Sequence, residues 1–363
     1  MRIEGAHGFS LVAAGQRLQA IEIPDLEAGP DEVIVEVAGC GICHTDVGFA
    51  ADGVPTRKAF PLILGHEISG RVVSAGDHSA SWLGSTVIIP AVIPCGNCPA
   101  CKAGRSTICR NQFMPGNDGD GGFATHVRVP ARGLCSVPQP LPPGFDLELL
   151  SVIADAVTTP WEAIRRAAVG PDDVVVFVGV GGVGGFGVQI AAALGAAVVA
   201  VDIDQHKLEL AAQHGAGLAI NSSGGNEKDA KTAVRTFAKN SGRHGIGLKI
   251  FETSGTTAGQ QIAFNLLDFG GYLGVIGFTP KKTELRLSNL MALDATARGN
   301  WGCPPDEYPA ALDLVLHGKV SITPYVEIHP LDDAPAVFDA AIRHAISRRV
   351  ILKNTLYGKR ERT

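Results

Sequence analysis

Residues 173–184 read DVVVFVGVGGVG, and this stretch decides the fold of the chain. A continuous apolar run of this kind is typical of a strand buried on both faces of a parallel sheet. It leads into Gly179, Gly181 and Gly184, which have the spacing G-x-G-x-x-G, and a helical pattern follows. Such glycines allow a tight turn and a close backbone approach to a pyrophosphate at the helix N-terminus. The stretch therefore predicts a dinucleotide-binding turn between a strand and a helix.

The next strand signal, residues 197–202, ends in Asp202, which lies 18 residues after Gly184. A carboxylate at this point can accept hydrogen bonds from both ribose hydroxyls of NAD, and it would repel the 2′-phosphate of NADP. Strand and helix patterns keep alternating, so we expect a doubly wound parallel sheet over residues 155–306. A glycine-rich turn that binds no nucleotide is the alternative interpretation.

The rest of the chain has a different pattern. Residues 1–154 contain short apolar runs that glycine and proline interrupt, which is typical of a partly open β-barrel. Residues 307–363 resemble a return to this first domain. With 363 residues, the chain is long enough for two domains of ordinary size. We therefore predict one domain from 1–154 and 307–363, and a nucleotide-binding domain from 155–306.

Composition restricts the partners. The chain is 45% hydrophobic and 18% charged, and its formal net charge is −5. This balance gives no support for nucleic acid or an anionic membrane as a partner. The sequence contains no apolar run long enough for a transmembrane helix and no signal-peptide pattern at its start, so we expect a cytoplasmic protein.

Four of the eight cysteines fall within residues 94–110, with the spacing C-x2-C-x2-C-x7-C. Four thiolates at short loop spacings suit tetrahedral zinc, which binds sulfur at about 2.3 Å and needs no open position in a structural site. Two disulfides or an iron–sulfur cluster are the alternatives. We predict a structural zinc held by Cys95, Cys98, Cys101 and Cys109.

A second cluster lies earlier in the chain. Cys43, in the stretch GCGICHTD of residues 39–46, and His66, in the stretch GHE of residues 65–67, are a soft and an intermediate ligand for one zinc. Cys40 is a further candidate ligand. A buried thiol and a core histidine are the alternative, but their occurrence beside a dinucleotide fold favours a metal. A catalytic zinc needs three protein ligands and one open position.

Together these motifs resemble those of the zinc-containing medium-chain alcohol dehydrogenases, over essentially the whole chain and in the same order. The resemblance implies a GroES-like barrel domain and a Rossmann domain. It also implies one catalytic and one structural zinc per chain. The activity implied is hydride transfer from an alcohol to NAD, with the catalytic zinc lowering the pKa of the substrate hydroxyl.

The resemblance also implies roles for individual residues. Cys43 and His66 would bind the catalytic zinc, and Asp46 would accept from the other ring nitrogen of His66. Thr45 would start the proton relay. Glu67 would lie close to the metal and serve as an alternate ligand. Relatives often carry a histidine a few residues after the threonine, where this chain has a glycine, so the proton would leave by the cofactor ribose and water or by His44. Alternatively, His44 would contact the pyrophosphate of the cofactor instead of carrying the proton.

The third ligand departs from the family pattern. Many relatives have a cysteine in a segment C-x-G-x-T-x-Y-x-A, and this chain has DAVTTPWEA over residues 155–163. One alignment places Asp155 at the ligand position and another places Ala154 there. We prefer Asp155, because the other choice leaves a buried carboxylate without a partner. A plain helix start capped by Asp155 is the remaining alternative.

The family pattern implies ten cofactor contacts, of which Thr253, Ile276 and Asn300 are expected at the carboxyl ends of strands. The ten are Thr159, Gly179, Gly181, Gly182, Val183, Asp202, Lys207, Thr253, Ile276 and Asn300.

No spacing identifies the alcohol. In its overall pattern, including the stretch NDGDGGFATH of residues 117–126, the chain is similar to the 6-hydroxycyclohex-1-ene-1-carbonyl-CoA dehydrogenases of anaerobic aromatic degradation. That branch oxidises a ring secondary alcohol next to an enoyl-CoA thioester. A general secondary-alcohol or polyol dehydrogenase and a non-catalytic NAD-binding structural protein are the alternatives. The family implies a homodimer or homotetramer.

Overall fold

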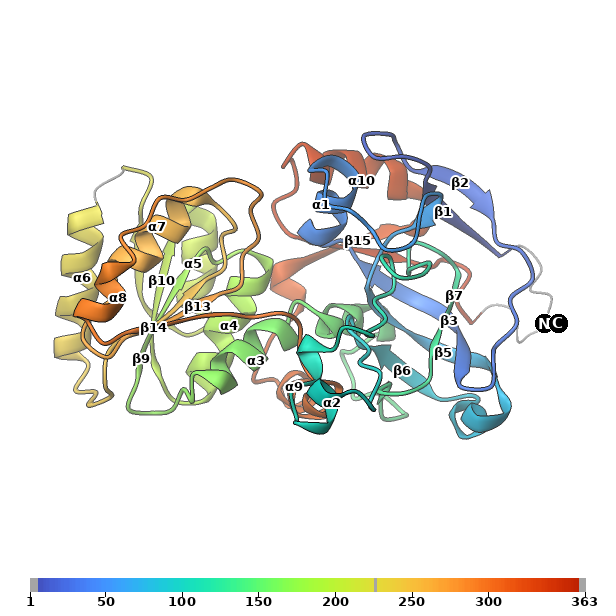
Figure 1. The fold of residues 1–363 in the computed structure, drawn as a ribbon, viewed down its shortest axis with the longest axis horizontal. Coiled ribbons are helices and arrows are strands. Elements are labelled where there is room, and N and C mark those ends of the chain that lie inside the picture. The colour runs from blue at the N-terminus through green and yellow to red at the C-terminus, as the bar shows by residue number, and fades with distance from the viewer. Residues whose placement is uncertain (1–5, 225–226, 359–363) are drawn as a thin grey trace. The chain divides into compact units, whose positions relative to one another are not determined.

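The computed structural model describes residues 6–224 and 227–358. The chain divides into two compact units (Figure 1). The first consists of Met1–Thr158, Gly302–Leu312 and Val326–Thr363, and the second of Thr159–Trp301 and Asp313–Tyr325.

The second unit contains a six-stranded sheet with the order β11-β10-β9-β12-β13-β14, and every neighbouring pair is parallel. Relative to its first strand, β9, this is the order 3-2-1-4-5-6 of a dinucleotide-binding sheet. Strand β9 is buried along its whole length, as the apolar run predicted. The strands are β9 (Val174–Val178), β10 (Ala197–Asp202), β11 (Ala216–Asn221), β12 (Lys249–Glu252), β13 (Tyr272–Val275) and β14 (Thr296–Gly299).

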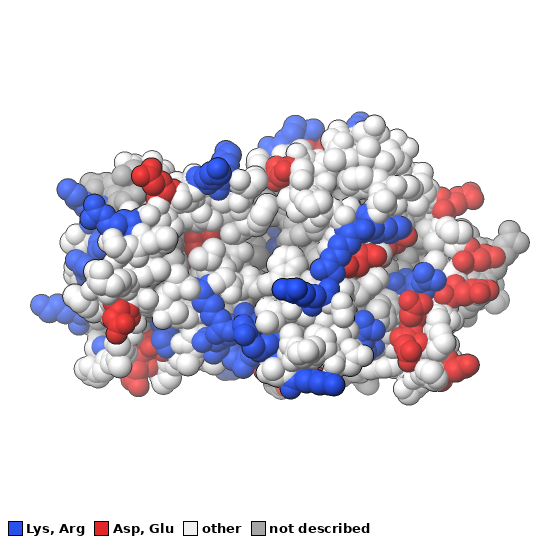
Figure 2. Space-filling view, in the orientation of Figure 1, with Lys and Arg blue, Asp and Glu red and all other residues white. Residues whose placement is uncertain are grey.

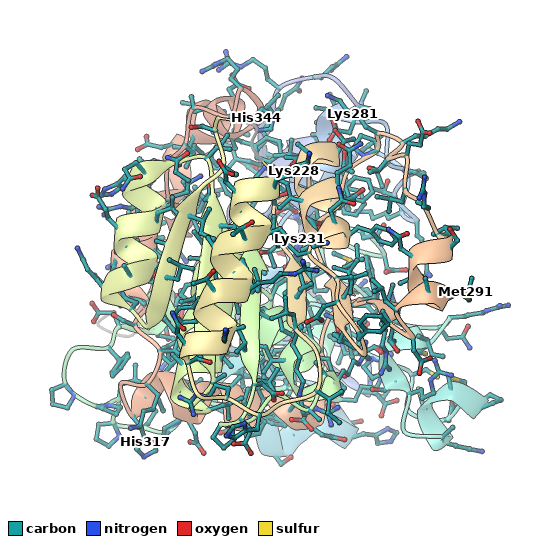
Figure 3. All side chains as sticks on the ribbon, turned by 90° about the vertical axis from the view of Figure 1, so that its left-hand side faces the viewer. Lys228, Lys231, Lys281, Met291, His317 and His344 are labelled. Carbon is teal, nitrogen blue, oxygen red and sulfur yellow. The ribbon has the colours of Figure 1, made fainter. Side chains whose placement is uncertain are left out.

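Helices connect these strands, which is how parallel neighbours must be joined. In Figure 3, α6 carries Lys228 and Lys231 in front of the sheet, and Met291 marks α8. The helices of this part of the chain are α3 (Thr158–Arg166), α4 (Gly182–Ala193), α5 (Gln205–Gln213), α6 (Glu227–Asn240), α7 (Thr257–Asn265) and α8 (Ser288–Ala292). The core of the sheet is rich in valine and isoleucine, including Val176, Val199 and Ile250.

The first unit is built on a seven-stranded sheet with the order β15-β16-β3-β5-β6-β8, in which β7 also pairs with β3. A three-stranded sheet has the order β2-β1-β4. The strands are β1 (His7–Leu11), β2 (Gln19–Glu22), β3 (Glu32–Gly41), β4 (Leu62–Ile63), β5 (Glu67–Ala75), β6 (Thr86–Ile89), β7 (His126–Pro130), β8 (Cys135–Ser136), β15 (Val326–Pro330) and β16 (Arg349–Lys353).

Short helices complete the first unit and hold several candidate site residues at their ends. The α-helices are α1 (His44–Ala51), α2 (Pro99–Lys102) and α10 (Ala334–Ile342), and α9 (Tyr308–Leu316) begins in this unit. The 3-10 helices are η1 (Asp77–Trp82), η2 (Ser106–Ile108), η3 (Leu147–Ala154), η4 (Pro305–Glu307), η5 (Thr323–Tyr325) and η6 (Leu331–Asp333). The predicted mixed α/β architecture, with a doubly wound parallel sheet in the second unit, is confirmed.

One prediction of secondary structure was wrong in detail. The pattern from 148 to 168 indicates one helix, but the structure has η3, a break at Asp155, and then α3. The backbone of Asp155 has φ −140° and ψ −57°, outside the helical region. Pro160 explains part of the break, because a proline has no N–H to donate to the carbonyl of Ala156, four residues earlier, and its ring crowds that carbonyl.

The surface fits the composition. Lys and Arg side chains occur in several separate groups on the face that Figure 2 shows, without one continuous basic field. Within the part of the chain that the structure describes, no helix has both the length and the apolar character needed to cross a bilayer.

Candidate active site and metal centres

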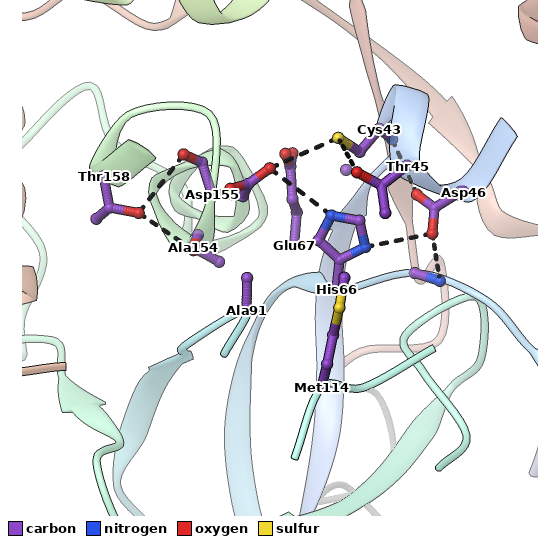
Figure 4. A network of polar contacts seen from close by, with 12 residues as sticks. Cys43, Thr45, Asp46, His66, Glu67, Ala91, Met114, Ala154, Asp155 and Thr158 are labelled. Carbon is purple, nitrogen blue, oxygen red and sulfur yellow. Dashed lines mark hydrogen bonds and ion pairs between the residues drawn. The ribbon is translucent and has the colours of Figure 1, made fainter. Parts of the chain in front are cut away.

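Four potential metal ligands from distant parts of the first unit converge. The ligand atoms of Cys43, His66, Glu67 and Asp155 all lie within 4.8 Å of one another. Asp155 Oδ2 lies 3.5 Å from Cys43 Sγ and 3.7 Å from His66 Nε2 (Figure 4). The three segments that carry them are the start of α1, the start of β5 and the end of η3. Cys40 is buried next to this group but is not one of its four members.

Asp46 fixes the two segments that carry Cys43 and His66. Its Oδ2 accepts a hydrogen bond from the backbone N–H of Cys43 at 2.9 Å, and its Oδ1 accepts from Gly65 N–H at 3.1 Å. The same Oδ1 lies 3.3 Å from Nδ1 of His66. Burial by itself would lower the pKa of His66, but Asp46 and Asp155 outweigh it and hold that pKa well above its ordinary value. Asp46 thus orients the imidazole with Nε2 toward Asp155 and Cys43.

Glu67 has a cationic partner that the sequence analysis missed. Nη1 of Arg349 lies 2.6 Å from Glu67 Oε1 and donates a second hydrogen bond to the carbonyl of Ile42 at 3.2 Å. Oε2 of Glu67 is buried without a hydrogen-bond partner among the described residues. Desolvation, opposed by Arg349 and supported by Asp155, raises the pKa of Glu67 to about 7. Arg349 is 282 residues away in sequence, and no local motif points to it.

The chemistry of this group fits a divalent cation. Three acidic side chains and a thiol surround one histidine and one arginine in a largely buried place, and one carboxylate oxygen lacks a partner. Buried carboxylates without compensation are costly, and a metal ion supplies that compensation. One sulfur, one imidazole nitrogen and a carboxylate oxygen form a ligand set that zinc accepts while keeping a position open.

The two residues expected to move the proton lie at the start of α1. Thr45 is half-buried, and its Oγ1 lies 3.7 Å from Cys43 Sγ. His44 is exposed, and its ring stacks on that of His344 with centroids 5.9 Å apart. Thr45 is therefore next to the ligand group, whereas the ring of His44 meets a histidine of the loop after α10.

The four cysteines of the 94–110 lobe also converge. Their sulfur atoms lie within 4.8 Å of one another, and none of the four forms a disulfide. A hydrogen bond from the backbone of Asn97 lowers the pKa of Cys95 to about 6, whereas desolvation and then the Cys98 thiol raise that of Cys101 to about 12. The four thiols are therefore not all deprotonated together unless a cation binds between them. The lobe has the closed four-sulfur arrangement of a structural zinc site.

The three glycines of the G-x-G-x-x-G turn, between β9 and α4, differ in how closely other atoms approach them. Gly179 has φ +90°, and a Cβ there would lie 2.5 Å from the Cα of Ser254. A Cβ on Gly184 would lie 1.9 Å from the carbonyl oxygen of Gly179, so the third glycine lets α4 pack against the turn. By contrast, a Cβ on Gly181 would meet nothing within 4 Å. Gly181, Gly182 and Val183 are only half-buried at the start of α4, where backbone N–H groups suit a pyrophosphate.

Asp202 is bound to the same turn. Its Oδ2 accepts from Val180 N–H at 2.8 Å, and its Oδ1 accepts from the N–H groups of Ile203 and Asp204 at 2.8 and 3.0 Å. The carboxylate is therefore fixed at the carboxyl end of β10, beside the glycine turn. This is where a ribose carrying two hydroxyls would meet it.

The other predicted cofactor contacts lie at the ends of neighbouring elements. Thr253 follows β12 and donates to the carbonyl of Gly179 at 2.5 Å. Ile276 follows β13, and its N–H donates to Glu252 at 2.9 Å. Asn300 follows β14, donates to Thr159 O at 3.2 Å and accepts from Arg166 at 3.0 Å. Lys207 lies in α5, and its backbone N–H donates a hydrogen bond to the side chain of Asp204, which caps that helix. Roles in cofactor binding stay predictions for all of them.

A dinucleotide sheet, a four-cysteine lobe and a mixed-ligand metal site define a zinc-dependent oxidoreductase. Residues 29–139 match the family model described as Alcohol dehydrogenase GroES-like domain, and residues 182–317 match Zinc-binding dehydrogenase. An alcohol dehydrogenase of Geobacillus stearothermophilus is 32% identical over 338 residues, 93% of this chain and 95% of that protein. An L-threonine 3-dehydrogenase of Streptomyces avermitilis is 28% identical over 317 residues, 85% of this chain and 88% of that protein.

A solved structure agrees with these matches. The alcohol dehydrogenase of the archaeon Aeropyrum pernix superposes with a TM-score of 0.86 at 27% identity, over 96% of this chain and 100% of that chain. The chain belongs to the zinc-type medium-chain alcohol dehydrogenases. It is an oxidoreductase of the kind that acts on the CH–OH group of small-molecule alcohols, with a nicotinamide cofactor and zinc.

Proposed function

We propose that this enzyme uses NAD to oxidise a secondary alcohol to a ketone at a zinc held by Cys43, His66 and Asp155. The observation that carries the proposal is the approach of Asp155 Oδ2 to both Cys43 Sγ and His66 Nε2. Glu67 is the alternate ligand, because Arg349 neutralises it and one of its oxygens stays unpaired. The ligand roles rest on this geometry and on the family pattern.

When bound, zinc polarises the substrate oxygen, and the nicotinamide accepts the hydride. The chain itself has to position the alcohol and remove its proton. The hydroxyl of Thr45, beside Cys43, is the group we assign to accept that proton. A threonine hydroxyl both accepts and donates, so it can pass the proton on to the cofactor ribose and water. Aspartate in place of a second sulfur donates less charge to zinc, which makes the metal a stronger Lewis acid.

NAD is the proposed cofactor because Asp202 places a negative charge where NADP carries its 2′-phosphate. The narrower substrate that the sequence resemblance suggests is a cyclic 6-hydroxyacyl-CoA thioester. The broader substrate class, simple secondary alcohols and polyols, is supported by relatives that carry the names alcohol dehydrogenase and L-threonine 3-dehydrogenase.

A substrate panel at fixed NAD tests the proposal. Simple secondary alcohols, polyols and a cyclic 6-hydroxyacyl-CoA are compared by the initial rate of NADH formation, with Thr45→Ser and Thr45→Val as matched variants. Thr45→Ser should retain most of the rate, and Thr45→Val should lose about 100-fold or more, the usual contribution of a positioned proton acceptor. Comparable turnover of simple alcohols would exclude the CoA ester as the specific substrate. No turnover of any alcohol by the zinc-loaded protein would overturn the proposed activity.

A further inference from the structure

Asp155 comes directly after the end of η3, in a short turn that separates η3 from α3. Its backbone angles belong to neither helix nor strand. A carboxylate on such a turn reaches Cys43 and His66 only if the preceding peptide group is held in one orientation. That peptide group carries the carbonyl of Ala154, so the partners of this carbonyl decide where Asp155 points.

Two hydroxyl groups converge on that carbonyl. Tyr308 donates its phenolic hydroxyl to Ala154 O at 2.5 Å, and Thr158 donates its hydroxyl to the same oxygen at 3.2 Å. The backbone N–H of Ala91 also approaches this oxygen, at 3.4 Å, so the two hydroxyls are its closer donors. Tyr308 and Thr158 flank the break from two different elements, the start of α9 and the start of α3.

The hydroxyl of Tyr308 has a second hydrogen-bond partner. It accepts a hydrogen bond from the backbone N–H of Ala91 at 3.1 Å, just after β6. Tyr308 is 1% exposed, and its burial raises the pKa of the phenol well above the ordinary value, so the proton stays in place to be donated. The phenol therefore links three segments at one buried point.

We propose that Tyr308, together with Thr158, is a positioning residue that holds the Asp155 carboxylate on the catalytic zinc. The proposal rests on the proposed function, because it takes Asp155 as a ligand. Neither hydroxyl touches substrate or metal in this role. Each acts through the peptide group between Ala154 and Asp155. Residues that orient metal ligands in this way typically change metal affinity by roughly 10- to 100-fold when they are removed.

The test uses the full-length zinc-loaded protein in zinc buffers set by a competing chelator. Tyr308→Phe should lose the more weakly held of two zinc ions at a roughly 10- to 100-fold higher free zinc concentration than the parent. The four-cysteine zinc should be unchanged. Tyr325→Phe is the matched control, since Tyr325 is a largely buried tyrosine of the other unit whose hydroxyl donates to Leu210 O at 3.5 Å. It should leave both zinc ions as they are.

A second readout separates positioning from a general loss of structure. With Co²⁺ in the catalytic site, the visible ligand-field spectrum reports the arrangement of ligands, and it should change in Tyr308→Phe but not in Tyr325→Phe. In the Asp155→Asn background, Tyr308→Phe should cause little further loss of zinc affinity, because both changes act through one carboxylate. Thr158→Val should lower the zinc affinity of the catalytic site, and Thr158→Ser should keep it close to that of the parent. This pair tests the inference even if Tyr308→Phe does not fold.

The outcomes distinguish the two claims. Unchanged zinc affinity in Asp155→Asn would overturn the proposed ligand set itself. The positioning role alone would be overturned if Asp155→Asn lowered the zinc affinity while Tyr308→Phe and Thr158→Val kept the affinity and the spectrum of the parent.

Discussion

Asp202 is the side chain that we expect to set the cofactor preference of the proposed enzyme. Replacing it by serine removes a charge-assisted hydrogen bond to the ribose and the repulsion of a 2′-phosphate. We expect kcat/KM for NAD to fall about tenfold or more, as loss of a hydrogen bond to a charged group implies, and kcat/KM for NADP to rise. Steady-state kinetics with both cofactors measure the ratio.

Asp204→Asn is the control for this change. Asp204 caps α5 and lies two residues on, and asparagine caps equally well. Its cofactor ratio should stay that of the parent. If Asp202→Ser kept the parental preference as well, the carboxylate would have no part in choosing the cofactor.

Glu67 should make the stability of the metal-free protein depend on pH. Its pKa is raised from an ordinary 4.5 to about 7, so the folded state binds this proton more tightly than the unfolded state. The stability from this proton is therefore fully present below pH 4.5 and is lost as the pH rises through about 7. The raised pKa of His66 acts in the same direction. For Glu67 the loss is up to about 3 kcal/mol of unfolding free energy.

Urea unfolding of the metal-free protein at several pH values checks this. The unfolding free energy of the parent should decrease between pH 4.5 and 7, the interval set by the two pKa values of Glu67. Glu67→Gln cannot titrate and should show a flatter profile. A parent whose metal-free stability rises with pH over this interval would contradict the assigned protonation of Glu67.

At the residue scale, the sequence identified the candidate metal ligands but not the residues that hold them in place. Cys43, His66 and Asp155 could be named because short motifs and a family pattern mark them. Arg349 and Tyr308 could not, because each meets its partner from more than 150 residues away. An arginine at the start of a strand and a tyrosine at the start of a helix have no local feature that separates them from ordinary surface or core residues.

At the scale of elements, the glycine turn between β9 and α4 separates packing from binding. Gly184→Ala places a Cβ 1.9 Å from the carbonyl of Gly179, and overpacking of this kind costs about 1–3 kcal/mol of unfolding free energy. Gly181→Ala meets nothing within 4 Å and should leave stability within about 0.5 kcal/mol of the parent. Its methyl group instead occupies space that the pyrophosphate needs, so NAD affinity should fall.

Thermal melts and NADH fluorescence titrations of the two variants measure these effects separately. Stable folding with weak NADH binding is expected for Gly181→Ala. If Gly181→Ala bound NADH as the parent does, the backbone of this turn would not approach the pyrophosphate.

Elements were predictable where the apolar pattern is continuous. Strand β9 and strand β10 follow directly from their valine-rich runs. Strand β14 has four exposed residues, and β11 contains a glycine and only one buried residue, so neither gives a strong signal on its own. The break at Asp155 was missed because the alanine-rich surroundings have helical character on both sides of it.

At the scale of the whole molecule, the candidate metal ligands and the predicted nucleotide-binding turn belong to different units. All members of the two metal-ligand groups lie in Met1–Thr158, and the glycine turn with Asp202 lies in Thr159–Trp301. Chelation of both zinc ions should therefore abolish alcohol oxidation while NADH binding changes less than about threefold. Fluorescence titration of the chelated protein measures this. A complete loss of NADH binding on chelation would show that the nucleotide site depends on the metal-bearing unit.

The overall architecture follows from the sequence because two periodicities divide the chain. Alternating strands and helices in the middle predict the parallel sheet, and short interrupted strands predict the barrel-like unit. The fine division does not follow. Residues Asp313–Tyr325 group with the nucleotide-binding unit, through contacts such as Gln189 with Ser321 and Phe186 with Tyr325. These contacts depend on side chains that meet only in the folded chain.

The zinc content of the parent and of Asp155→Ala tests the central claim most directly. Elemental analysis of the purified full-length proteins should give two zinc ions per chain for the parent, from the two ligand groups, and one for Asp155→Ala. NADH binding should be equal in both. One zinc per chain in the parent, or two in Asp155→Ala, would contradict a catalytic zinc held by Cys43, His66 and Asp155.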